Sequence, residues 1–171
     1  MTFLELAKER YSVRKYKDTP VEQEKLDMIL EAAKVAPTAC NKQPQRIYVV
    51  QSDKMREKLA SVCRFTFGAP VIMVVCYDKT REWQNDLTPG YATGETDAAI
   101  VCTHMMLEAW ELGLGSCWVA WFNADEVAKV LGIPENEQVL ALLPLGYAAD
   151  GAKPASLHTT YRENADMVTV L

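Results

Sequence analysis

The sequence predicts an α+β fold in a single domain that covers residues 1–171. Its length allows one sizeable hydrophobic core. Two nearly continuous apolar runs, at residues 69–78 and 138–148, are typical of strands that are buried on both faces. Other segments space their apolar residues as helices do. Because no linker, internal repeat or low-complexity tract separates these elements, we expect one domain.

Two helices are predicted before the first strand. Residues 1–10 begin with Thr2 and Glu5 at the spacing of a capping box, in which two side chains satisfy backbone N–H groups at the start of a helix. Residues 18–37 contain an apolar stripe at helical spacing, and Thr19 is the expected N-cap because a proline follows it. A second proline ends this helix.

The remaining elements alternate along the chain. Strands are predicted at residues 46–51, 69–78, 117–122 and 138–148. Helices are predicted at residues 52–63, 96–115 and 123–134. The helix at 96–115 is apolar nearly all round, which is typical of a central, buried helix. Residues 80–95 show weak periodicity, and we interpret them as a long loop, a lid or an element that wraps a second subunit.

Charge is distributed unevenly along the chain. The whole sequence has a net charge of −5, but residues 1–17 hold five basic and two acidic residues, a local charge of +3 that leaves −8 for the rest. The basic residues of this segment are Lys8, Arg10, Arg14, Lys15 and Lys17. A nucleic-acid partner requires a basic face, so the acidic body argues against one. The pattern suits a small anionic ligand better.

Cysteine usage and hydropathy indicate a cytoplasmic protein. The five cysteines are an odd number and never form C-x-x-C, which argues against a disulfide framework and for reduced thiols. No apolar run approaches the roughly 20 residues that span a bilayer, and the N-terminus lacks the pattern of a signal peptide. We therefore expect no membrane partner.

Some motifs that could carry chemistry have simpler interpretations. The segment "GLGSCW", residues 113–118, is similar to a dinucleotide fingerprint. It follows a helix and has Trp118 in place of the third glycine, so a helix C-cap is favoured. His104 and Glu108 have the i, i+4 spacing of two metal ligands. Because only one other histidine exists, we favour a core histidine and expect no metal, with a metal-dependent protein as the alternative.

Two polar segments are better candidates for a binding site. "RYSVRKY", residues 10–16, places Arg10 and Arg14 where two guanidinium groups can converge on one phosphate, and Ser12 can add a hydroxyl. The alternative is a solvated basic turn. "PTACNKQP", residues 37–44, offers backbone N–H groups and amide side chains against which a planar heterocycle could lie. The alternative is an ordinary loop between a helix and a strand.

Together these segments resemble the nitroreductase-like family of FMN-dependent oxidoreductases. "ERYSVRKY" resembles the family's R-x-S-x-R signature, and "AAKVAPTACNKQPQ" resembles its A-P-S-x-x-N-x-Q-P-W segment. "APVIMVVCYD", "LEAWELGLGSCWVAWF" and "LLPLGYA" resemble its A-P-x-x-I-x-V, E-A-x-x-x-G-L-G-x-x-W and P-x-G-Y-P segments. The match covers about residues 5–150 in the family's order. It implies a central mixed β-sheet flanked by helices, in an intertwined homodimer that binds FMN at the interface.

The resemblance implies roles for the basic segment and the tail. The positions that would hold the phosphate and ribityl chain of FMN are Arg10, Ser12 and Arg14. Tyr11 would contribute mainly through its backbone. The family commonly supplies a late Lys or Arg to the phosphate, and the candidates in this chain are Lys153, His158 and Arg162. Of these we favour His158, on its distance from the C-terminus.

The resemblance also implies contacts with the isoalloxazine ring. The positions that would cover the ring, from the partner chain, are Pro37, Thr38, Ala39 and Asn41. Ala120 and Trp121 match the segment whose backbone runs beside the reactive N5 edge. The chain departs from the family at Thr38, where serine is common, and at Gln45, where tryptophan often follows Q-P.

The function that the resemblance implies is that of an FMN-dependent NAD(P)H oxidoreductase. NADH or NADPH would give hydride to flavin N5 and leave, and a nitroaromatic, a quinone or a similar planar acceptor would then take the electrons in a ping-pong reaction. We assign no catalytic residue, because solvent can supply protons to an open site. The alternatives are a flavin-binding or storage protein and a specialised flavin enzyme of the dehalogenase, flavin-fragmenting or azoline dehydrogenase type.

Overall fold

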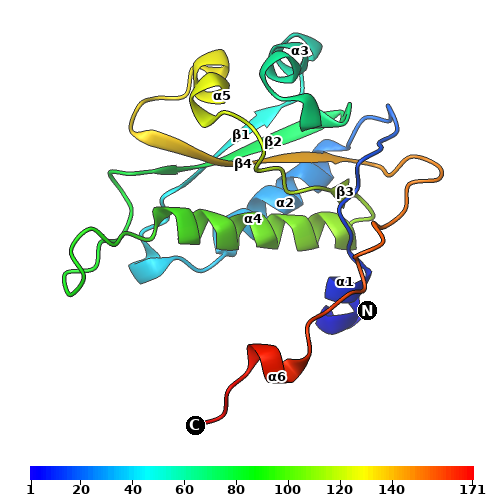
Figure 1. Cartoon of the computed structure of the whole chain (residues 1–171). Coiled ribbons are helices and arrows are strands. Elements are labelled where there is room, and N and C mark those ends of the chain that lie inside the picture. Colours follow the sequence, from blue (N-terminus) through cyan, green and yellow to red (C-terminus); the bar gives the residue numbers. More distant parts are fainter.

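A four-stranded sheet with two helices on each face forms the centre of the computed structural model, which describes residues 1–171. The strands are β1 (Gln45–Val50), β2 (Val71–Asp78), β3 (Gly115–Ser116) and β4 (Glu137–Gly146), and their order in the sheet is β1-β2-β4-β3. Helices α2 (Gln23–Val35) and α4 (Gly94–Glu111) cover one face, and α3 (Asp53–Val62) and α5 (Ala124–Leu131) cover the other (Figure 1). The predicted α+β fold is confirmed.

Two further helices lie near the chain ends. Helix α1 (Phe3–Glu9) lies beside the C-terminal half of α4, and the short α6 (Asn164–Met167) belongs to a tail that projects away from the body (Figure 1). Short 3₁₀ helices at Ala39–Asn41 and Arg64–Thr66 interrupt two of the loops. No helix in the structure is both long enough and apolar enough to cross a membrane.

The sheet pairs differently from the mixed sheet that was expected. All three ladders between the named strands are antiparallel. Parallel pairing is confined to a single bridge between Ser12 and Ser116, where the N-terminal segment runs along the outer edge of β3. The N–H of Val13 donates to the carbonyl of Ser116 at 2.9 Å and fixes this segment to the edge.

Helix α2 begins three residues later than the predicted first residue, Pro20. Its N-cap is Glu22, whose side chain makes no capping bond. The hydroxyl of Tyr147 donates to the Glu22 carboxylate at 2.7 Å, and Val21 is buried in the core in the extended approach to the helix. The expected N-cap at Thr19 is therefore wrong, because tertiary contacts decide where this helix starts. The capping box of Thr2 and Glu5 is confirmed.

The strand predicted at 117–122 is much shorter in the structure. Strand β3 ends at Ser116, but pairing with β4 continues through the bond from the Cys117 N–H to the Pro144 carbonyl at 3.2 Å and through the bridge of Val119 with Leu142. The residue of β4 that would next pair with this strand is Pro144, which has no N–H to donate to the ladder. Residues 117–119 therefore stay beside β4 without forming a regular ladder, and residues 120–122 lead away from the sheet edge to α5.

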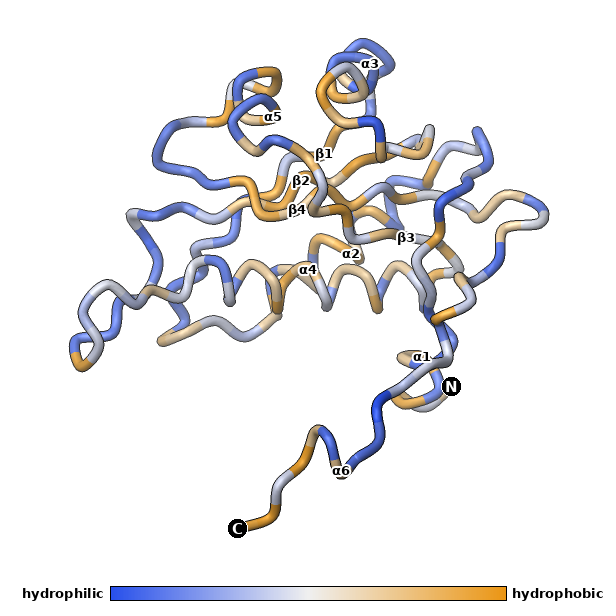
Figure 2. The backbone as a smooth tube through the Cα atoms, in the orientation of Figure 1, coloured by the Kyte–Doolittle hydropathy of each residue, from blue (hydrophilic) through white to orange (hydrophobic).

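Strand β2 is buried on both faces, as its apolar sequence predicts. Residues 71–76 are each at most 2 % exposed. Met73 belongs to the buried cluster that contains Met105 of α4, whereas its neighbour Val74 belongs to the cluster that contains Leu59 of α3. Figure 2 shows the hydrophobic colouring along the central strands and along α4. Two apolar layers, one on each side of the sheet, therefore make up the core.

Truncating Leu143 in β4 should destabilise the fold, because its side chain is fully buried. We expect Leu143→Ala to lower the free energy of unfolding by about 2–5 kcal/mol, from lost burial and a residual cavity. Leu87→Ala is the matched control, since Leu87 is 94 % exposed; its effect should stay below about 0.5 kcal/mol. Urea denaturation measures both, and equal effects would contradict the assigned burial.

Candidate functional site

The basic segment 10–16 is pinned in an extended form along the sheet edge. Besides the Val13 bond to Ser116, the hydroxyl of Tyr16 lies 2.8 Å from the carbonyl oxygen of Val13 and 3.0 Å from that of Pro144. A Cβ atom at Gly115 would collide with the side chain of Val13, so only glycine allows this close approach. The local structure therefore holds the segment's side chains in defined positions.

The structure brings Arg10, Ser12 and Arg14 together around one end of β3. The Nη1 atom of Arg10 is buried and has no hydrogen-bond partner, and neither arginine forms an ion pair with a carboxylate. Arg14 donates from Nη1 to the backbone carbonyl of Ser12 at 3.3 Å. A buried, charged donor without an acceptor is costly. An anion with several oxygens, such as a phosphate, would satisfy it.

The thiol of Cys117 lies within the electrostatic influence of the guanidinium groups of Arg10 and Arg14. Burial raises the pKa of this thiol, and the guanidinium of Arg14, the hydroxyl of Ser12 and the guanidinium of Arg10 oppose that rise. The effect of the two guanidinium groups on this pKa indicates a positive electrostatic potential at the start of the 117–122 segment. The thiol itself is 2 % exposed and directs its weak S–H donor to the carbonyl of Trp118.

Of the three tail candidates, the structure brings His158 to the basic segment. Its Nε2–H donates to the carbonyl of Lys8 at 3.1 Å, and its ring packs edge-on against Tyr11 with 6.2 Å between centroids. Arg162 instead donates to the carbonyl of Asp166 within the tail, and Lys153 makes no hydrogen bond or ion pair. Contact of His158 with a phosphate stays a prediction.

The loop at residues 38–43 has a strained backbone. Cys40, Asn41 and Gln43 have φ angles of 47°, 53° and 48°, in the left-handed region that residues other than glycine seldom adopt. Each such residue costs on the order of 1–3 kcal/mol, least for asparagine, and persists only where its surroundings enforce it. The side chain of Gln43 donates to that of Asn41 at 2.8 Å, so the two amides stiffen the loop together.

A buried carboxylate ties this loop to the first turn of α4. Asp97 is 2 % exposed and accepts from the N–H of Ala39 at 3.0 Å and from the hydroxyl of Thr93 at 2.9 Å. The N–H groups of 41–43 are likewise used inside the loop. The predicted supply of free backbone donors at 37–44 is therefore mostly absent, because the loop satisfies its own backbone. Asp97 was not predicted as a functional residue. The one feature of the sequence that could have indicated it is an acidic residue near the start of an otherwise apolar helix.

The two halves of the predicted site lie at opposite ends of α4. Tyr11 packs against Trp110 near the C-terminal end, with 5.2 Å between ring centroids, whereas Ala39 is bonded to Asp97 near the N-terminal end. A helix of 18 residues is about 27 Å long. Within one copy of the chain, the basic segment and the residues Pro37, Thr38, Ala39 and Asn41 are therefore too far apart to hold one small ligand (Figure 1).

Ala120 and Trp121 lie on the exposed part of the segment between β3 and α5. Their backbone N–H groups donate no hydrogen bond within the chain, so two donors are free for a ligand. The Trp121 side chain is 75 % exposed and stacks on Phe65, with 5.2 Å between centroids and 21° between ring planes. Phe65 and its neighbour Arg64 were not predicted from the sequence, because two aromatic residues around one threonine are too common a pattern to indicate a site.

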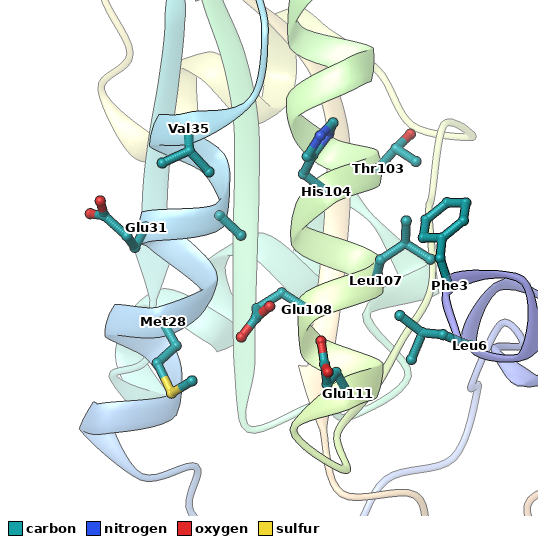
Figure 3. A pocket seen from close by; sticks show the side chains of 11 residues that line it. Phe3, Leu6, Met28, Glu31, Val35, Thr103, His104, Leu107, Glu108 and Glu111 are labelled. Atoms are coloured by element: carbon teal, nitrogen blue, oxygen red, sulfur yellow. The ribbon is translucent and has the colours of Figure 1, made fainter. Parts of the chain in front are cut away.

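A groove of about 700 Å³ runs between α1, α2 and α4 (Figure 3). Its lining includes Phe3 and Val35, which are 71 % and 67 % exposed, and also His104 and Glu108. His104 donates from Nδ1 to the carbonyl of Ile100 at 2.9 Å, not to Glu108. Burial and the neighbouring Glu111 raise the pKa of Glu108. No group of three or more His, Cys, Asp or Glu side chains is placed to hold a metal ion.

Known proteins match this chain over most of its length. A crystal structure of a nitroreductase family protein from Clostridium difficile 630 has a TM-score of 0.92 and 38 % identity, covering 99 % of this chain and 98 % of the other. A structure described as an FMN-dependent nitroreductase from Clostridium difficile R20291 has a TM-score of 0.77 and 30 % identity, with coverage of 95 % and 99 %.

A curated relative from Methanothermobacter thermautotrophicus is 33 % identical over 157 residues, which is 88 % of this chain and 79 % of the relative. It is described as a candidate NADH dehydrogenase/NAD(P)H nitroreductase. The sequence model of the Nitroreductase family matches residues 7–64 and 62–147. This chain therefore belongs to the nitroreductase family.

Proposed function

We propose that this chain binds FMN through the Arg10–Arg14 segment and uses NADH or NADPH to reduce planar acceptors. Family membership and relatives described as FMN-dependent and NAD(P)H-dependent support an FMN-dependent oxidoreductase. The observation that carries the assignment to this chain is the buried, unpartnered Nη1 atom of Arg10 beside Ser12 and Arg14. These residues fit the phosphate of FMN, since they supply two guanidinium groups and a hydroxyl with no competing carboxylate.

Bound FMN would supply the redox chemistry, taking a hydride at N5 and passing two electrons on to the acceptor. Each turnover oxidises one NAD(P)H and takes one proton from solvent; it reduces a quinone to a hydroquinone, or a nitro group to a nitroso group with release of water. The chain's residues bind and orient. Arg10 and Arg14 hold the phosphate, and the free N–H groups of Ala120 and Trp121 stabilise negative charge on a ring beside them.

No side chain needs to act as a general acid or base. The cysteine closest to the basic segment, Cys117, is buried and hydrogen-bonded to a backbone carbonyl. The exposed position of Ala120 leaves that segment open to solvent, which can deliver the proton. Acceptor choice would then depend on shape and charge near the ring more than on acid–base groups, and flat quinones and nitroaromatics fit such a site.

The site would be completed by a second copy of the chain. The strained loop and the basic segment lie at opposite ends of α4, so a second copy whose α4 runs the other way would bring its loop to the first copy's basic segment. The groove along α1, α2 and α4 offers an apolar face for this contact. The projecting tail carries exposed apolar residues, among them Met167 and Val168, that could pack on such a partner. We therefore propose an intertwined homodimer with two FMN sites.

Replacing both Arg10 and Arg14 with Ala should abolish FMN binding. The wild-type protein should purify yellow, and NADH or NADPH should bleach it anaerobically, with reoxidation by a quinone. The double variant should be colourless while its far-ultraviolet circular dichroism is unchanged. Removing two charge-assisted contacts of about 1.5–3 kcal/mol each weakens binding at least about 100-fold. Stoichiometric FMN in the folded double variant would refute the site. Yellow protein that neither nucleotide bleaches would indicate flavin storage.

Asp97→Asn should loosen the loop that covers the ring. Ala39 donates to Oδ1 and Thr93 donates to Oδ2, and asparagine replaces one of these oxygens with an NH2 group that cannot accept and also removes the negative charge. We expect the dissociation constant for FMN to rise about tenfold and the visible flavin spectrum to shift. Asp86→Asn, at an exposed position without side-chain bonds, should change neither. Equal dissociation constants in the two variants would argue against a positioning role for Asp97.

Val35→Glu should weaken the proposed dimer without affecting the fold of one copy. Val35 is the last residue of α2 and is 67 % exposed, so a charge there is harmless until a second copy covers it. We expect the dimer dissociation constant to rise about 30-fold or more, with parallel loss of FMN on dilution. Ala60→Glu adds the same charge to an exposed position on α3, on the other face of the sheet. Analytical ultracentrifugation measures both variants, and a wild-type monomer that retains FMN would contradict the proposal.

A further inference from the structure

An aromatic platform lies on the α3 and α5 side of the sheet, outside the predicted binding segments. We use this name for Arg64, Phe65 and Trp121. The rings of Phe65 and Trp121 are stacked, and the guanidinium carbon of Arg64 lies 4.9 Å and 5.2 Å from their respective centroids. These distances are within the range of cation–π attraction, which favours a guanidinium over the face of a ring. The three side chains therefore support one another.

The core holds this platform in place from below. Phe65 lies in the 3₁₀ helix that follows α3 and packs against the buried cluster that contains Leu59 and Val127. Trp121 stacks on Phe65 yet remains 75 % exposed. A large apolar ring that is fixed on one side and open on the other is a stacking surface for a second planar molecule.

The charge of Arg64 is not neutralised within the chain. Its side chain is exposed and forms no ion pair or hydrogen bond with any other residue. The body of the protein is acidic, with a net charge of −5, so an anionic molecule is repelled over most of the surface. The unpaired guanidinium of Arg64, beside the exposed ring of Trp121, instead attracts an anionic molecule at this point of the surface.

The platform lies near the basic segment, at the same end of the predicted site as the proposed phosphate-binding residues. Trp121 is five residues beyond Ser116, the residue that pairs with Ser12, so the chain between them spans at most about 17 Å. The free N–H groups of Ala120 and Trp121 are the donors that the proposed function places beside the flavin ring. The groove proposed as the dimer face lies on the α2 and α4 side of the sheet, whereas the platform lies on the α3 and α5 side.

We propose that this platform selects the oxidising substrate, and that the substrate class is planar aromatic acceptors that carry a negative charge, such as a carboxylate or sulfonate. The inference rests on the proposed function. The acceptor's ring would stack on Trp121 while its anionic group pairs with Arg64. The phosphate-binding arginines then serve the cofactor, and Arg64 serves the acceptor.

Two probes of nearly equal shape test the charge preference: para-nitrobenzoate, which is an anion, and para-nitrobenzamide, which is neutral. The readout is the ratio of kcat/KM for the two, measured on the FMN-loaded protein with NADH or NADPH. Arg64→Gln should lower the ratio of benzoate to benzamide about fivefold, the upper range for one partly exposed charge pair. Arg64→Lys should keep most of the ratio, because the charge remains.

Lys58→Gln is the matched control, because it removes one positive charge from the exposed surface of α3 without touching the platform. It should leave both kcat/KM values unchanged. Trp121→Ala should raise KM for both probes by a similar factor, since it removes the stacking surface. An unchanged ratio in Arg64→Gln would overturn the inference while FMN binding and turnover stay intact. A wild-type protein that binds FMN and reduces a quinone but neither probe would overturn the inference alone, whereas one that also fails to reduce a quinone would overturn the proposed reductase.

Discussion

The buried helix α4 fixes how far apart the two predicted binding segments lie. Its buried side chains, Met105 among them, form one apolar layer of the core with strand β2. The helix is therefore rigid, and its length fixes the separation of everything attached to its ends. Tyr11 packs at one end and the strained loop is bonded to Asp97 at the other. One chain therefore carries two separate half-sites: the basic segment 10–16 at one end of α4 and the loop 38–43 at the other.

Charge explains why the two half-sites differ. The basic segment gathers cations at a sheet edge, where Arg10 has a buried donor without an acceptor. The loop at 38–43 gathers no cation beyond Lys42, which is exposed, and satisfies its own backbone donors. The first half-site is therefore suited to an anion, and the second to the face of a ring. A phosphorylated planar molecule needs both kinds of surface, and the proposed second copy would bring them together.

The sequence was a sound guide wherever a short-range pattern determined the outcome. The apolar run at 69–78 became the central strand, and the five segments that resemble the nitroreductase-like family led to the correct fold. It was a poor guide where a long-range partner decides. The hydroxyl of Tyr147 donates to the Glu22 carboxylate, and α2 starts after this residue, later than predicted. Pro144 has no N–H for the ladder beyond β3, so the pairing there is irregular. Asp97 and the stack of Phe65 with Trp121 depend on contacts between residues more than 50 positions apart, for which periodicity carries no signal.

The strained loop is the clearest sign that residues 38–43 are retained for more than connecting a helix to a strand. The nine residues 36–44 could join α2 to β1 without three left-handed residues other than glycine, and an unstrained loop would be more stable. The chain instead buries the Asp97 carboxylate to hold this conformation, and it stiffens the loop through Asn41 and Gln43. The left-handed residues and the buried carboxylate both cost stability in an isolated copy. A rigid loop surface of this kind is suited to contact with something outside its own chain, and in the proposed homodimer that would be the flavin ring held by the second subunit.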